Sequence, residues 1–233
     1  MKSTTCLLLI FLLITFLGCG PEQDDDDSSD SSDTSTACVE FESSEDLNEA
    51  LALDQSCYQL SGTLTVDAGD LTIGSETTVH FQSHTVLVVE TSMTIGAGAT
   101  LIFGEDAALN IDGGSLTADA SGEDVESIKF IGAREVAGHW QGIRLANSSQ
   151  TNRLANVEVR HGGSALWDQG WSVTRANILV DQGATLQLTD VDISDSGHHG
   201  VSVTGGQLQG CDDLRFTNIE RHHIFAAEPD QGC

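Results

Sequence analysis

The chain has 233 residues and is strongly acidic, with 36 aspartates and glutamates against 9 lysines and arginines and a formal net charge of −27. This balance excludes nucleic acid as a partner and disfavours binding to anionic membrane surfaces by charge, since both need a basic patch. The residues from about 38 onward are numerous and apolar enough for one domain with a substantial core.

Residues 1–18 have the features of a secretory signal peptide. A short basic start precedes an almost entirely apolar run from Cys6 to Leu17, which is too short to span a bilayer comfortably. Gly18-Cys19 follows, and the segment resembles the signals of bacterial lipoproteins, although Phe16 and Leu17 depart from the usual leucine and small residue. The resemblance implies acylation of Cys19 and a membrane partner through the lipid; an ordinary secretory signal is the alternative.

Residues 19–37 form an acidic polar segment, and the letters GPEQDDDDSSDSSDTST (20–36) contain no aromatic or aliphatic side chain. Such a segment cannot bury enough apolar area to fold, and its charges repel one another, so we predict an extended, disordered tether. Gly20 replaces the aspartate that, by the same resemblance, retains lipoproteins at the inner membrane. We therefore expect the outer membrane or cell surface, with a periplasmic or secreted location as the alternative.

The cysteines indicate an oxidising compartment. Cys6 would leave with the signal and Cys19 would be acylated, and the remaining four cysteines allow three pairings. We predict disulfides that bracket the two ends of the folded region, because neither then crosses its length: Cys38 with Cys57, and Cys211 with Cys233. None has the spacing of a zinc or redox CxxC motif, so a structural role is favoured.

Residues 38–57 are expected to cap the domain. The segment from Ser44 to Leu53 begins with a serine N-cap and early acids, and its apolar residues Leu47, Ala50 and Leu51 have helical spacing. It contains the one convincing helix of the sequence.

Residues 58–233 consist of short runs with alternating apolar residues, separated by turns rich in Gly and Asp. Such runs predict many short strands. Without helices between them, they leave a sandwich, an antiparallel barrel or a parallel β-helix as candidate folds.

An internal repeat favours the β-helix. Residues 190–203 align with residues 213–226 at a constant offset of 23. The alignment places like residues on one another: Val191 on Leu214, Ile193 on Phe216, Asp195 on Asn218, His199 on His222 and Val201 on Ile224. A repeat in the low twenties suits a three-sided coil of short strands, and such coils must stack to bury their inward faces. We expect six or seven coils.

The segment Gly138-His139-Trp140-Gln141-Gly142-Ile143 resembles the Gly-x-Trp-x-Gly-Ile motif of bacterial right-handed parallel β-helix, or pectin-lyase-like, proteins. The resemblance covers about residues 57–226. It implies an all-β fold, a right-handed parallel β-helix solenoid with a short N-terminal capping helix. Lyases, hydrolases and adhesins share this fold, so the function has to be argued from a site.

Enzymes of this fold use clustered carboxylates, often with Ca²⁺, and a basic residue. Asp212-Asp213 is the Asp-Asp pair of the folded region, but it lacks the surrounding hydrolase motifs, so we interpret it as a solvated turn. Four arginines are spread over successive coils: Arg144, Arg153, Arg160 and Arg175. They either bind uronate or balance the charge of the acidic surface, and we favour charge balance.

Two further groups are candidate ligand sites. With the 23-residue register, His199 and His222 lie about 4.8 Å apart on adjacent rungs. They could chelate a transition metal such as Zn²⁺ or Cu²⁺, or respond to low pH, although stacking for packing alone is the favoured interpretation. Trp167 and Trp171 fall in an extended loop, and we hypothesise that they form an exposed platform for stacking sugars.

These observations predict a lipid-anchored protein of the cell envelope that acts as a non-catalytic binding or structural and adhesive module. Its expected partner is a polysaccharide or another envelope protein. The alternative is a carbohydrate-active enzyme, similar to a polysaccharide lyase, that acts on acidic polysaccharide with Ca²⁺.

Overall fold

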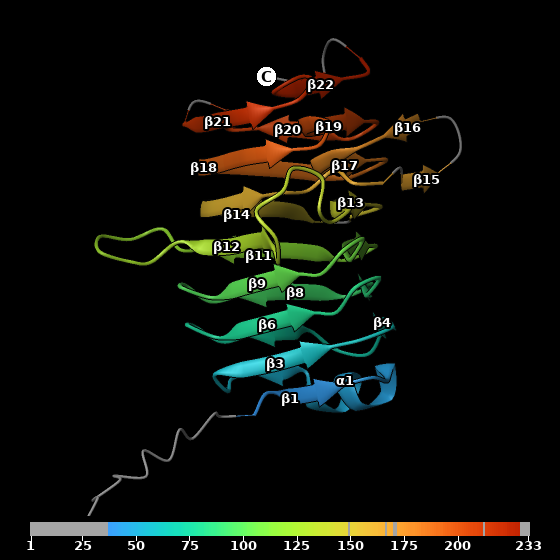
Figure 1. Cartoon of the computed structure of the whole chain (residues 1–233), viewed down its shortest axis with the longest axis vertical. Helices are drawn as coiled ribbons and strands as arrows, with labels where there is room; N and C mark the ends of the chain where they lie inside the picture. Colours follow the sequence, from blue (N-terminus) through green and yellow to red (C-terminus); the bar gives the residue numbers. More distant parts are fainter. Residues whose placement is uncertain (1–36, 149, 166, 170–171, 212, 229–233) are drawn as a thin grey trace, which may run out of the picture. The chain divides into compact units, whose positions relative to one another are not determined.

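Most strands of this protein pair in parallel with the strands one coil before and one coil after them (Figure 1). The structure is a computed structural model that describes residues 37–228 except 149, 166, 170, 171 and 212. The predicted signal peptide and nearly all of the predicted tether lie outside the described residues. Within the described part, no helix is long and apolar enough to cross a membrane.

The strands form three stacked rows, here called ladders A, B and C. Ladder A contains β1 (Val39–Phe41), β3 (Cys57–Leu60), β6 (Thr78–Phe81), β9 (Thr100–Phe103), β12 (Ile128–Gly132), the second parts of β14 (Thr151–Arg160) and β18 (Thr185–Ser196), and β21 (Leu214–Ile219). Ladder B contains β4 (Thr63–Val66), β7 (Val86–Val89), β10 (Ala108–Asp112), β13 (Gly142–Ala146), β17 (Ala176–Asp181), β19 (His199–Thr204) and β22 (Ile224–Ala226). Ladder C contains β2 (Ala52–Leu53), β5 (Leu71–Ile73), β8 (Ser92–Ile95), β11 (Ser115–Asp119), the first parts of β14 and β18, and β20 (Gln207–Gln209).

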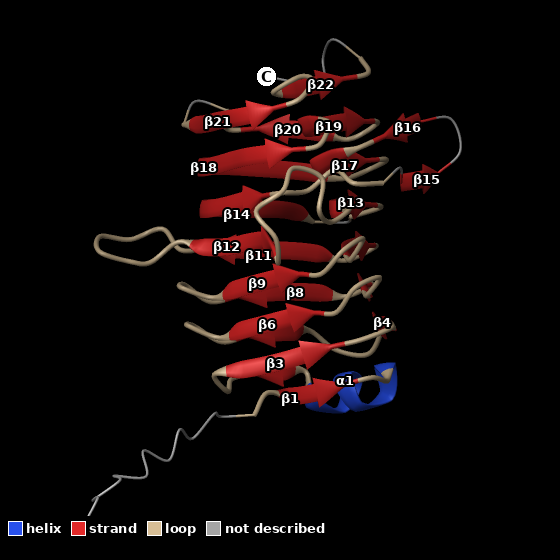
Figure 2. Ribbon diagram, in the orientation of Figure 1, coloured by secondary structure: helices blue, strands red, loops and turns tan. Residues whose placement is uncertain are grey.

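Ladders C and A are joined by the long strands β14 and β18. Each of these strands turns the corner at one residue with left-handed backbone, Asn156 (φ 51°) and Asp190 (φ 53°). In the described part of the chain, ladders A and C therefore form one 13-stranded sheet and ladder B forms a 7-stranded sheet. Figure 2 shows these strands as stacked layers. The prediction of an all-β parallel solenoid is confirmed.

The 23-residue register is also confirmed. Val191 pairs with Leu214, Ile193 pairs with Phe216, and Val201 pairs with Ile224.

The core lies inside the coils because side chains alternate between the two faces of each strand. In β3, Tyr58 and Leu60 are buried whereas Cys57 and Gln59 are half-buried. Aromatic rings stack across three coils, with ring centroids 4.3 Å apart for Phe81 and Phe103 and 3.9 Å apart for Phe103 and Trp140. The Trp140 indole is fully buried and donates a hydrogen bond to the Arg160 carbonyl at 2.7 Å. The tryptophan of the Gly-x-Trp-x-Gly-Ile segment is thus a core residue.

The N-terminal end carries the predicted helix in a shorter form. Helix α1 spans Ser44–Ala50, and its N-cap is Ser43 instead of Ser44, with the Ser43 side chain accepting a hydrogen bond from the Asp46 N–H. The helix ends because Leu51 adopts a left-handed conformation with φ 46°. The following residues, expected to be helical, form strand β2 and pair with β5.

One predicted disulfide is confirmed, and it links the first two coils. Cys38 and Cys57 are bonded, with their Cα atoms 4.6 Å apart. Cys211 is also disulfide-bonded, and its predicted partner, Cys233, lies outside the described residues.

Gly142, in the same segment, has a backbone conformation and a close contact that a side chain would not fit. It has φ 118°, and a Cβ atom there would lie 2.3 Å from the Ala176 carbonyl oxygen of the next coil. Gly62 also has positive φ, at 75°, but a Cβ there would meet no atom within 4 Å.

We expect Gly142→Ala to lower the free energy of unfolding by about 3 kcal/mol or more, because steric overlap adds to backbone strain. Gly62→Ala serves as the control, since it adds the strain alone, about 1–2 kcal/mol. Urea unfolding followed by circular dichroism measures both. Equal losses for the two variants would contradict the close approach at Gly142.

Candidate functional site

The outer face of ladder A carries a polar array over the coils of β14, β18 and β21, which are neighbours in Figure 1. The three strands use one local pattern, in which an inward apolar residue lies between outward polar ones. The inward residues are Val159, Ile193 and Phe216. The polar array consists of Glu158, Arg160 and His161, then Asp192, Ser194 and Asp195, then Arg215, Thr217 and Asn218.

Parallel pairing places the array in rows. Glu158 pairs with Asp192, which pairs with Arg215, and Arg160 pairs with Ser194, which pairs with Thr217. In-register neighbours in a parallel sheet lie about 4.8 Å apart. The array therefore repeats hydrogen-bonding groups at this spacing along the stack of coils.

Most charged groups of the array are already paired with one another. Arg215 donates hydrogen bonds to both oxygens of Asp192 and to Asp190, the latter at 2.7 Å. These bonds raise the pKa of Arg215. Arg160 forms an ion pair with Glu158 at 2.6 Å. Such pairs orient the guanidinium groups towards the neighbouring carboxylates.

The third row of the array has left-handed backbone conformations. His161, Asp195 and Asn218 all have left-handed backbones, with φ of 68°, 50° and 53°. The Asn218 amide donates a hydrogen bond to Asp195 at 2.7 Å, and the His161 Nε2 atom lies 3.8 Å from an Asp195 carboxylate oxygen. Left-handed conformations are unfavourable for most L-residues and often occur at functional positions.

The protonation states of this row follow from its contacts. Burial alone would raise the pKa of Asp195, but hydrogen bonds from Asn218 and Ser194 outweigh burial and lower the pKa below its ordinary value. Burial lowers the pKa of His161, and the nearby Asp195 carboxylate offsets only part of this effect. At neutral pH, Asp195 is therefore ionised and His161 is neutral.

A shallow depression of about 310 Å³ opens over the array. Its lining contains both charged and hydroxyl side chains: Arg160, Asp192, Ile193, Ser194, Asp195, Arg215 and Thr217. Two buried nitrogens beside it, Arg160 Nε and His161 Nδ1, have no hydrogen-bond partner among the described residues. Buried polar atoms are usually satisfied, so these nitrogens are unusual features of this region.

The sequence repeat had already aligned Asp195 with Asn218, but the two rows that contain the arginines were missed. The segment from Asn156 to Gly163 contains an earlier copy of the repeat, with the same apolar pair, and aligning it would have placed these arginines. Arg160 pairs with Ser194 at a separation of 34 residues, so a constant offset of 23 does not find it.

The predicted histidine pair lies on ladder B and in the following coil. The rings of His199 and His222 stack, with centroids 5.2 Å apart. The ring of Phe225 also stacks on that of His199, with centroids 4.8 Å apart. The Nδ1 atom of His199 accepts the His222 backbone N–H at 3.4 Å. No third His, Cys, Asp or Glu of the described residues completes a metal-ligand group with this pair. The geometry thus offers no third ligand for the predicted metal.

The proposed tryptophan platform is wrong for Trp167. Trp167 lies in β15 (Trp167–Gln169), which forms an antiparallel hairpin with β16 (Ser172–Thr174). Its side chain is 9% exposed and packs with Ala108 and Leu179 on the outer face of ladder B. A buried indole offers no face to a sugar. Trp171 lies outside the described residues.

Two of the remaining arginines pair with aspartates, but only Arg153 does so at the surface, where balance was expected. Arg144 is buried and pairs with Asp181 at 2.9 Å, and Arg153 pairs with Asp119 at 2.7 Å. Of the predicted Asp-Asp turn, Asp212 lies outside the described residues and Asp213 is exposed.

The strand pairing defines the class of this protein as a parallel β solenoid with one helix in its described part. Comparison with known proteins adds no relative, because no family model, no curated protein and no solved structure matches the chain. The likeness to lipoproteins and to right-handed pectin-lyase-like proteins therefore stays a prediction from the sequence.

The stacked histidines predict a loss of stability at acidic pH. Burial, together with His198, His222 and Arg221 nearby, lowers the pKa of His199 to about 4 from an ordinary value of 6.5. The unfolded chain therefore binds more protons between these values. The contribution of His199 to the free energy of unfolding is therefore largest above pH 6.5. It falls by about 2–3 kcal/mol as the pH is lowered to 4.

Urea unfolding at intervals between pH 7 and pH 4 measures this effect. We expect His199→Phe, which keeps an aromatic ring in the stack, to show a shallower fall in stability than the unsubstituted protein. The remaining slope then comes from other groups, including His161 and His198, whose pKa values are also lowered by burial. Parallel curves for the two proteins would contradict the role of His199.

Proposed function

We propose that this protein is a non-catalytic binding module of the bacterial cell envelope and that the polar array is its ligand-binding face. The observation that carries the proposal is the depression over the array, because charged and hydroxyl groups line it in register and are held by mutual ion pairs. A preformed surface of this kind binds with a small entropic cost.

The array favours a neutral saccharide as the ligand. Four carboxylates surround the two arginines: Glu158, Asp190, Asp192 and Asp195. This excess of negative charge, together with the net charge of −27, repels anionic polymers. A sugar hydroxyl both donates and accepts hydrogen bonds, so it suits a surface where carboxylate acceptors alternate with guanidinium and hydroxyl groups.

The membrane anchor is a separate part of the proposal. It rests on the apolar run that ends in Gly18-Cys19 and on the acidic residues that follow. Acylation of Cys19 would fix the protein to the outer membrane or cell surface, and the tether would allow the binding face to reach ligands away from the lipid.

The enzyme alternative has weaker support. A general acid needs a proton at neutral pH, whereas the pKa of Asp195 at the array is lowered. A calcium-assisted lyase needs a cluster of free carboxylates. The one group of three or more ligating side chains among the described residues is Cys38, Cys57 and His80.

Binding of a panel of neutral oligosaccharides to the full chain, measured by calorimetry, tests the proposal. We expect Arg215→Ala to weaken binding by about tenfold or more, because it removes a central hydrogen-bond donor and releases Asp190 and Asp192. Arg153→Ala is the matched control, since it breaks an arginine–aspartate pair on ladder C, away from the depression. Equal affinities for the two variants, or no binding to any glycan, would refute the proposal.

The same protein preparation also tests the alternative function, a polysaccharide lyase. Incubation with uronate polymers and Ca²⁺ should give no rise in the absorbance of unsaturated products. A rise that Arg215→Ala abolishes would instead support a lyase at the array.

A further inference from the structure

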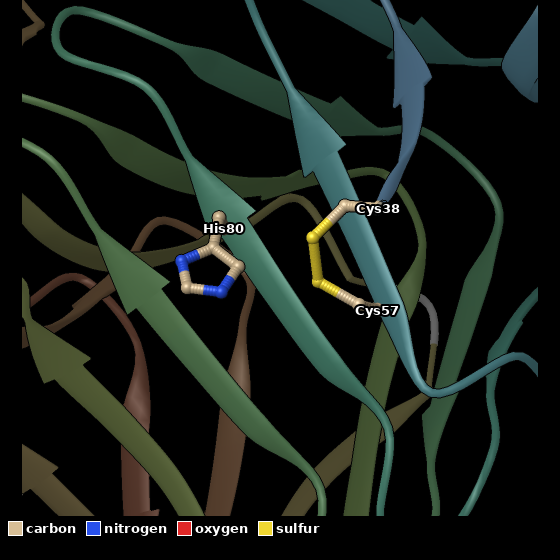
Figure 3. A group of neighbouring side chains, drawn as sticks. All are labelled: Cys38, Cys57 and His80. Carbon is tan, nitrogen blue, oxygen red and sulfur yellow. A yellow bond between two sulfur atoms is a disulfide. The ribbon is translucent and has the colours of Figure 1, made fainter. Parts of the chain in front are cut away.

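Three side chains that bind metals well meet at the N-terminal end of ladder A (Figure 3). Cys38 directly precedes β1, Cys57 begins β3, and His80 lies in β6. One sulfur from each cysteine and one ring nitrogen of His80 all lie within 4.8 Å of one another. All three residues are half-buried.

The strand register creates this group. Val39 pairs with Tyr58, so the preceding residues Cys38 and Cys57 are neighbours, and Gln59 pairs with His80 on the next coil. Val39 and Tyr58 point inward, so the cysteines point outward, and His80 alternates with the buried Val79 and Phe81. The His80 ring lies beside the disulfide (Figure 3) and makes no hydrogen bond with the described residues.

We propose that Cys38, Cys57 and His80 form a redox-gated site for a thiophilic divalent cation such as Zn²⁺. In the disulfide form the two sulfurs are bonded to each other and are not thiolate ligands. Reduction supplies two thiolates beside an imidazole. Zinc prefers this sulfur and nitrogen donor set, and a three-ligand site leaves its fourth position to water.

A low-molecular-mass thiol can act as the reductant of the Cys38–Cys57 disulfide. Two thiol molecules transfer two electrons to the Cys38–Cys57 bond, forming one external disulfide and two cysteine thiols. Zn²⁺ then binds both sulfurs, and the two thiol protons pass to solvent. The ion links β1, β3 and β6, so it restores the lost connection between the first two coils and extends it to the third.

A cobalt titration of the full chain tests this site. In the protein used, the four other cysteines are replaced by serine: Cys6, Cys19, Cys211 and Cys233. A phosphine reductant, which adds no competing thiol, opens the disulfide. We expect the reduced protein to bind one equivalent of Co²⁺ with a thiolate-to-cobalt charge-transfer band, which Zn²⁺ abolishes, and the oxidised protein to show no band.

His80→Ala identifies the imidazole as a ligand. We expect it to weaken cobalt binding by more than about tenfold, because even outer-shell changes at metal sites cost this much. His84→Ala is the control, since His84 is exposed in the next turn. Zn²⁺ should also raise the melting temperature of the reduced protein and leave the oxidised protein unchanged.

Circular dichroism establishes whether the reduced protein stays folded. Cobalt binding that does not depend on His80, as in an unfolded dithiol, would overturn the proposal. The absence of a charge-transfer band after reduction would also overturn it.

Discussion

The in-register parallel pairing of each strand with the coils on either side is the constraint on which the rest of the structure depends. It satisfies the backbone hydrogen bonds, and because side chains alternate along a strand, it also decides which residues point inward. Val159 and Ile193 enter the core for this reason, the half-buried Phe216 packs against it, and the polar residues beside them form rows outside. The histidine stack and the disulfide arise from the same pairing.

The sequence alone was sufficient to predict the pairing of coils that follow each other at a constant spacing in the chain. The offset of 23 residues predicted the pairing of Val191 with Leu214 because no insertion separates those coils. It could not predict the position of Arg160 beside Ser194, since the hairpin of β15 and β16 lengthens the intervening coil. Insertions at the corners of a solenoid change the spacing in sequence but leave the register in space unchanged.

Trp167 shows a second limit of sequence reasoning. A tryptophan between polar and glycine residues suggested an exposed loop, but the outer face of ladder B is itself apolar at Ala108 and Leu179. All six residues of β17 are buried, which is the pattern of a strand covered on both faces. The hairpin therefore buries its tryptophan against an outward-facing patch. The outer face of ladder A at β18 and β21, in contrast, leaves its polar groups accessible.

The disulfide at Cys38–Cys57 also has a mechanical consequence. In a solenoid, the hydrogen bonds between coils run along the stacking direction, so tension between its two ends loads every junction between coils and the weakest junction separates first. The first junction, between β1 and β3, is covalently closed. Under a pull from the N-terminal side, rupture must therefore begin beyond β3, and the first two coils transmit the force as one unit.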